Sequence, residues 1–157
     1  MSNFAFLQAE WPVLHEEASK AEALVYNDPR AACFHARRTL ELLVNWAYKY
    51  DASLRLPCRD NLSALLHEPT FKAAAGQTVL AKALLINDAG NDAVHSRRPV
   101  QESDASAAVR DLFHVGYWLA HTYARQPGPA PGLAFDASAV PRSTSVSKRT
   151  LEQLRAL

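Results

Sequence analysis

Residues 28–50 read DPRAACFHARRTLELLVNWAYKY, and this stretch decides the fold class. Its apolar residues recur at alternating four- and three-residue steps, at Ala36, Leu40, Leu43, Ala47 and Tyr50. An average step of about 3.5 residues puts them on one face of an α-helix that packs roughly 20° from parallel to its neighbours. Asp28 before Pro29 marks the helix start, because Asp accepts from free backbone N–H groups and Pro has no N–H to leave unpaired.

Three further segments have the same spacing. The first comprises Phe4, Leu7, Trp11, Leu14, Ala18, Ala21 and Val25. The second comprises Val79, Ala83, Ile86, Gly90 and Ala93, and the third comprises Ala105, Ala108, Leu112, Val115, Leu119 and Thr122. No comparable alternation of period two occurs, and Gly is scarce (5 residues). The sequence therefore predicts an all-α fold, a four- to five-helix up-down bundle.

Proline and glycine mark where these helices are expected to begin and end. Pro12 indicates either a short piece before the first long helix or a kink inside it, because Pro removes a backbone hydrogen bond. Asp60 is a candidate cap for a short helix that reaches Leu66. A second short helix is expected to start at Pro69 and to end at Gly76.

The composition changes after residue 125. Residues 126–132 read QPGPAPG, and prolines continue to Pro141, which is typical of a linker. Residues 147–157, SKRTLEQLRAL, resume a helical pattern with Leu151, Leu154 and Leu157 on one side. We expect a bundle over 3–125, a linker over 126–146, and over 147–157 the start of a helix or coiled coil that continues in a longer protein; a short frayed terminal helix is the alternative.

Composition and charge exclude several classes of protein. The chain has 157 residues and a formal net charge of +1, which gives no strong electrostatic footprint for nucleic acid. No apolar run is long enough to cross a membrane, and the N-terminus has no signal-peptide pattern. Two cysteines, Cys33 and Cys58, make no disulfide framework and favour a reduced, cytoplasmic chain.

The most polar local feature is the segment 87–96, NDAGNDAVHS. Asn91 and His95 are four residues apart and share a helix face, and Gly90 allows another side chain or backbone to come close. In one interpretation, His95 is an acid, a base or an anchor in a small polar site. In the other, Asn91 and His95 form hydrogen bonds across the bundle that fix helix register. The second is favoured, because no nucleophile, metal cluster or second histidine stands at a supporting spacing.

Charged residues also interrupt the apolar pattern of the decisive stretch. Glu41 follows Arg38 by three residues and Arg37 by four, so one pair is expected to bridge on the helix surface, worth about 0.3–0.5 kcal/mol. Alternatively, an Arg points inward and needs Glu41, Asn91 or His95 as a partner. Both alternatives stay open, and the candidate polar network is Arg38, Glu41, Asn91 and His95.

Motifs for metal, nucleotide or nuclease chemistry are absent from the sequence. There is no HExxH, no CxxC, no glycine-rich phosphate loop and no restriction-type nuclease core, so we assign no metal, cofactor or catalytic residue to this chain. The weak candidates for phosphate contact are Arg97, Arg98, Arg142, Lys148 and Arg149, with Arg155 adding a further charge to the tail.

Longer strings carry a resemblance to a known family. They are residues 28–48, DPRAACFHARRTLELLVNWAY; residues 61–71, NLSALLHEPTF; residues 90–96, GNDAVHS; and residues 112–125, LFHVGYWLAHTYAR. The chain resembles, over about residues 3–125, the HEPN-like helical domain of unknown function at the N-terminus of type I restriction enzyme R subunits. The resemblance implies a bundle, a linker and coiled coil, and then an ATP-dependent, helicase-like translocase. It also implies that ATP, Mg²⁺ and DNA bind the full-length protein, and that this chain contacts other domains or subunits of a restriction-modification complex.

Ribonuclease members of the wider HEPN group are the main alternative. They carry an Arg separated from a His by four to six residues, and for His95 those positions hold Asp88, Ala89 and Gly90. None of the three is basic, so the ribonuclease residues are not carried over. A HEPN-type ribonuclease or toxin that uses His95, and a homodimerisation module, remain the alternatives to the accessory domain.

Overall fold

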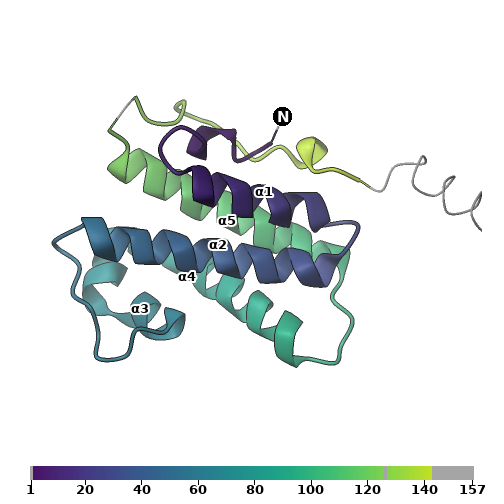
Figure 1. The fold of residues 1–157 in the computed structure, drawn as a ribbon, viewed down its shortest axis with the longest axis horizontal. Helices are drawn as coiled ribbons and strands as arrows, with labels where there is room; N and C mark the ends of the chain where they lie inside the picture. Colours follow the sequence, from purple (N-terminus) through teal and green to yellow (C-terminus); the bar gives the residue numbers. More distant parts are fainter. Residues whose placement is uncertain (1, 126, 143–157) are drawn as a thin grey trace, which may run out of the picture.

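The computed structural model describes residues 2–125 and 127–142, and every regular element in these ranges is helical (Figure 1). In chain order the elements are η1 (Ala5–Leu7), α1 (Pro12–Leu24), α2 (Pro29–Tyr50), α3 (Leu62–His67), α4 (Pro69–His95), α5 (Glu102–Tyr123) and η2 (Ala137–Ala139). The long helices α1, α2, α4 and α5 alternate in direction along the bundle (Figure 1). The predicted all-α bundle is confirmed.

Helix ends follow local capping chemistry. The Asp28 side chain caps α2, as predicted, and Pro12 begins α1, so the short piece before it is the separate element η1. The cap of α3 is Asn61 and not Asp60, because the Asn61 side chain accepts the backbone hydrogen bond there. At Gly76 φ is +81°, so α4 has two helical parts that meet at this residue, where the sequence predicted an end.

The core lies around α2, which packs against α1, α4 and α5, while α3 packs against α4 (Figure 1). All seven apolar residues of the first predicted face, from Phe4 to Val25, are buried. The prediction is wrong at the end of α2, where Tyr50 is 56% exposed and Tyr48 is buried instead. A helix turns every 3.6 residues, so a face drawn with a 3.5-residue step drifts away from the core along a long helix.

The described part of the expected linker lies back along the bundle. Asn3 donates from Nδ2 to the Asp136 carbonyl (2.9 Å), and the Asp136 N–H donates to Asn3 Oδ1 (2.7 Å). Val140 is buried, and the Phe135 ring lies 5.7 Å from that of Phe113. Residues 135–140 of the expected linker therefore lie against the bundle, because Phe135 and Val140 bury apolar surface that proline content does not reveal. The rest of the linker and the predicted helix over 147–157 fall outside the described residues.

Candidate functional site

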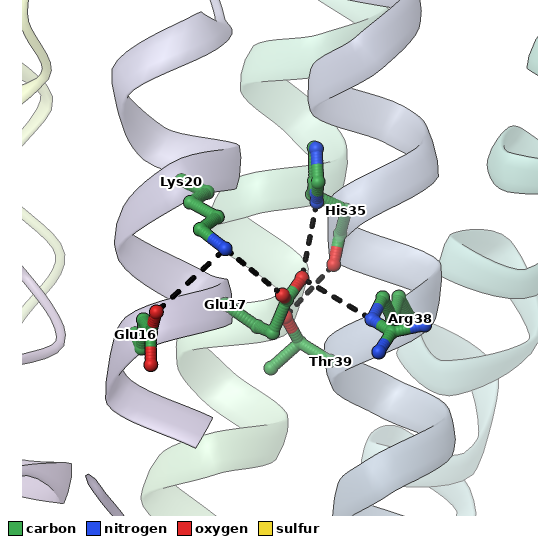
Figure 2. A network of polar contacts seen from close by, with 6 residues as sticks. All are labelled: Glu16, Glu17, Lys20, His35, Arg38 and Thr39. Carbon is green, nitrogen blue, oxygen red and sulfur yellow. Dashed lines mark hydrogen bonds and ion pairs between the residues drawn. The ribbon is translucent and has the colours of Figure 1, made fainter. Parts of the chain in front are cut away.

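A buried carboxylate joins α1 to α2 (Figure 2). Glu17 of α1 is 8% exposed, and its Oε2 lies 3.0 Å from His35 Nδ1 and 3.6 Å from Arg38 Nε, both on α2. Lys20, one turn further along α1, donates to Glu17 Oε1 over 3.4 Å. Three basic side chains thus converge on one carboxylate across the contact between α1 and α2.

The surroundings of Glu17 keep it ionised. Burial is the largest influence and opposes ionisation, but the hydrogen bonds and charges of His35 and Lys20 together outweigh it, so the pKa of the Glu17 carboxyl is lowered. Since an ionised carboxylate only accepts, His35 Nδ1 is the donor and its Nε2 points away from Glu17 (Figure 2). A carboxylate–histidine pair of this kind fixes an imidazole for proton transfer, but neither groove described below is lined by Glu17 or His35.

At Gly90, α4 lies directly against α2. A methyl group at position 90 would lie 2.9 Å from Cγ of Arg37 and closer still to its Cβ and Cδ, so the Arg37 stem fills the space left by the missing side chain. The Arg37 Nε then donates to Oδ1 of Asn87 (3.0 Å), which is 5% exposed. The close approach expected at Gly90 is confirmed, and the side chain that uses it is Arg37.

Arg30 binds the C-terminal end of α4. Its Nη1 donates to the carbonyls of Ala93 and Ser96, the latter over 3.1 Å, and its Nη2 donates to the carbonyl of Arg98 over 2.6 Å. The last carbonyls of a helix have no partners within it and carry partial negative charge, which a guanidinium satisfies well. Arg30 therefore fixes the turn that leads from α4 to α5.

A groove of about 590 Å³ lies between the second half of α4 and the first half of α5. Four aspartates line it: Asp88 and Asp92 on α4, and Asp104 and Asp111 on α5. The remaining charged lining residue is Arg98. Small and apolar residues line the rest, among them Ala89, Ala107, Ala108 and Val100, with Cys33 contributed by α2.

Polar contacts between helices lie near both ends of this groove. At one end Lys82 of α4 donates to Nδ1 of His114 on α5 (2.7 Å). Burial and the Lys82 charge lower the pKa of His114, so its imidazole is the neutral acceptor that this contact requires. At the other end is the turn that Arg30 holds. These contacts connect α4 to α5, and the turn between them to α2, on either side of the groove.

Two pKa shifts report the environment of the groove. Burial, followed by the charge of Asp104, raises the pKa of the Cys33 thiol to about 11. Burial also raises the pKa of Asp111, against the charges of Arg110, Lys82 and His114. Both groups are therefore partly removed from water, which disfavours their ionised forms.

A second groove, of about 350 Å³, lies between the start of α1 and the end of α2. Trp11, Trp46 and Tyr50 line it, together with Val13 and Lys49. The Trp46 ring centre lies 5.4 Å from that of Trp11 and 4.9 Å from that of Tyr50. Val13 is 60% exposed, so this aromatic groove opens directly to solvent.

The predicted network of Arg38, Glu41, Asn91 and His95 is not assembled. Arg38 turns to Glu17 of α1, and Glu41 is exposed, with no salt bridge to any residue in the described ranges. Asn91 is half-buried, and His95 is exposed at the last position of α4. The structure therefore does not place His95 in the buried position that the favoured interpretation expected, because its side chain is exposed at the last residue of α4.

The phosphate candidates are scattered. Arg97 and Arg98 are exposed, and Arg98 lines the groove of aspartates, where a phosphate would meet four like charges. The Arg142 guanidinium lies 4.9 Å above the Tyr26 ring. Lys148, Arg149 and Arg155 fall outside the described residues.

Among residues 2–125 and 127–142, no three His, Cys, Asp or Glu side chains are placed to hold a metal ion. In these ranges, too, no helix combines the length and apolarity needed to cross a bilayer.

Sequence reasoning missed Glu17, His35 and Arg30. A signal for Glu17 was present: it stands three residues after Leu14 and four before Ala21, on the buried face of its helix. An acid at such a position needs a basic partner. The sequence does not identify that partner, because the partner lies on a different helix.

These features define the class of protein: an all-α bundle whose helices are joined by buried polar contacts and which bears two open grooves. Residues 19–124 match the family described as Domain of unknown function (DUF4145), and the match spans more than half of the chain, so the chain belongs to this family. No curated protein and no solved structure matches the chain.

Proposed function

We propose that this chain is an accessory interaction domain of a protein resembling type I restriction R subunits, and that it is not itself an enzyme. ATP-dependent translocation and DNA cleavage, with their ATP and Mg²⁺, then belong to other regions of the longer protein. The bundle binds other domains or subunits of a cytoplasmic restriction-modification complex, and DNA is contacted through the full-length protein. The resemblance over residues 28–48, 61–71 and 90–96 supports the restriction part of this proposal.

The aromatic groove between α1 and α2 carries the interaction part. It places Trp46 and Tyr50 beside the exposed Val13, and Tyr50 itself is 56% exposed. Large aromatic side chains in a shallow, open groove are typical of surfaces that another protein covers, since covering them removes apolar area from water at about 25 cal/mol per Å².

The experiment uses the complete reading frame that encodes this chain. This chain and the rest of that protein are expressed separately and mixed, and their association is measured by isothermal titration calorimetry. We expect binding by the unchanged chain and about tenfold weaker binding by Tyr50→Ser, since a buried aromatic anchor is typically worth that much. Leu56→Ser is the matched control, because Leu56 is also an exposed apolar residue but lies outside both grooves.

Two results would contradict the proposal. A reading frame without a translocase contradicts the restriction part. Equal binding by Tyr50→Ser, Leu56→Ser and the unchanged chain contradicts the role of the groove. Sedimentation of the chain alone tests the dimer alternative: a dimer that Tyr50→Ser dissociates would make a second copy, and not another subunit, the occupant of the groove.

A further inference from the structure

We propose that the groove between α4 and α5 binds a basic amphipathic segment of a partner protein. Lysine or arginine side chains of the segment lie along the two rows of aspartates, and its apolar face lies on the alanines between them. The inference rests on the proposed interaction function but concerns a different surface and names the chemistry of the partner.

The shape of the groove suits an elongated occupant. Its lining on α4 runs from Leu85 to Asp92, a length of about 10 Å at 1.5 Å per residue, and continues to Ser96 after the helix end. On α5 the lining residues from Asp104 to Asp111 span about 10 Å. Small side chains between the two rows leave room for a helix or strand of another protein to approach the backbone closely. This is the geometry of recognition in which an amphipathic helix lies in a groove.

Charge complementarity indicates that the partner's charge is positive. Asp88 and Asp92 stand one turn apart on α4, and neither forms a salt bridge to the described part of the chain. Across the groove Asp111 is partly buried, which already disfavours its ionised form. A cation placed between the two rows gives Asp88 and Asp92 a partner and offsets the cost of ionising Asp111, because opposite charges a few ångströms apart attract each other. Phosphate groups of DNA or RNA would be repelled by the same residues.

The spread of the carboxylates distinguishes a polycation from a metal ion. In the residues that the structure describes, no three of the acidic or other ligating side chains converge on one point, as a metal requires. The four aspartates are instead distributed along two helices, which matches positive charges distributed along a peptide. Leu85 also lines the groove and is 59% exposed, so it offers an apolar contact. A peptide can use this contact through its apolar side chains, whereas a small polyamine has no side chains.

Binding is tested with a fluorescent synthetic helical peptide that has a row of leucines on one face, flanked on both sides by lysines, one for each aspartate of the groove. We expect saturable binding to the full chain by fluorescence anisotropy, weakened about fivefold by the double variant Asp88→Asn, Asp92→Asn, because two ion pairs at exposed carboxylates are lost. The matched control is the double variant Asp60→Asn, Glu41→Gln. It removes the same charge from two exposed residues outside the groove, and its binding should be unchanged.

A third variant distinguishes binding inside the groove from non-specific electrostatic attraction to the surface. Ala107→Leu fills the groove without changing its charge, and we expect it to weaken peptide binding about tenfold by occlusion. Circular dichroism checks that each variant stays folded. Equal binding by Ala107→Leu and the unchanged chain, equal effects of the two double variants, or displacement of the peptide by an equal concentration of spermidine would each overturn the proposal.

Failure here is distinguishable from failure of the proposed function. Tyr50→Ser acts on the other groove and is tested against the remainder of the longer protein. That result stands whatever the lysine peptide does.

Discussion

The contacts that α2 makes with its neighbours differ from the contact between α4 and α5. Where α2 meets α1 and α4, opposite or complementary groups lie against each other: Glu17 against His35, and Arg37 against Asn87. Between α4 and α5 like charges line both sides, from Asp88 to Asp111. The first arrangement holds helices together through hydrogen bonds, whereas the second places like charges along the two sides of a groove.

The comparison shows that small residues do not by themselves bring helices into close contact. At Gly90 the missing side chain is replaced at once by the stem of Arg37. Ala107, in contrast, is partly exposed and lines the open groove. Whether the space beside a small residue is filled depends on the charge and length of the side chain opposite.

The largest expected effect comes from closing the space at Gly90. Gly90→Ala places a methyl group against the rigid Cβ of Arg37, and we expect a loss of about 3 kcal/mol in the free energy of unfolding. The melting temperature should fall by roughly 10 °C.

Gly116→Ala on α5 is the control: its methyl group would meet side-chain atoms at 3.6 and 3.7 Å, an ordinary contact. With helix propensity favouring Ala, it should be neutral or stabilising by about 0.5–1 kcal/mol. Equal stability of the two variants in thermal melts would refute the tight crossing.

Neighbouring residues on the two sides of α4 give the second test. Asn87→Ala leaves the Arg37 guanidinium without its acceptor in a buried place, and we expect a loss of about 2 kcal/mol. Asp88→Ala changes an exposed residue of the groove, so the free energy of unfolding should move by less than about 0.5 kcal/mol. Urea denaturation measures the free energy of unfolding of both variants. An equal loss in Asp88→Ala and Asn87→Ala would contradict the difference between the two sides of α4.

Opposite pH dependences are expected from the two environments. The pKa of Glu17 is lowered on folding, so its stabilisation is present above about pH 4.5 and is lost as pH falls through the lowered pKa. The pKa of Asp111 is raised, so its ionised form destabilises the fold, and this cost disappears as pH falls through the raised pKa.

Two variants measure this difference. Near neutral pH, Glu17→Gln should be less stable than the unchanged chain by about 1.5 kcal/mol, and the gap should close in acid. Asp111→Asn should be at least as stable as the unchanged chain at neutral pH and should lose any advantage in acid. Glu16→Gln is the control for Glu17, since Glu16 is mostly exposed and its pair with Lys20 is worth little. A gap for Glu17→Gln that does not change with pH would contradict the assignment.

The smallest effect is expected at His95. Because the side chain is exposed at the end of α4, His95→Ala should change the free energy of unfolding by less than about 0.5 kcal/mol. A larger loss would restore the interpretation that His95 ties helices together. The same variant tests the ribonuclease alternative, since RNA cleavage by the pure chain that disappears with His95→Ala would establish it.

Much of the fold could be predicted from the sequence. The apolar spacing from Phe4 to Val25 placed seven residues in the core, Asp28 and Pro29 marked the start of α2, and Gly76 marked a break. These features depend on each residue's position around its own helix and on hydrogen bonds within a few residues. Local sequence contains that information.

Only the tertiary structure decided which polar groups meet. Arg37 and Arg38 are neighbours in the sequence, yet one contacts α4 and the other α1, because consecutive residues point about 100° apart around a helix. Spacing gives that angle but not which helix lies there. The choice of neighbour depends on how the helices rotate and slide against each other, which the whole core sets together. The groove between α4 and α5 arises in the same way, from residues that are unremarkable on each helix and become a site when the two helices face each other.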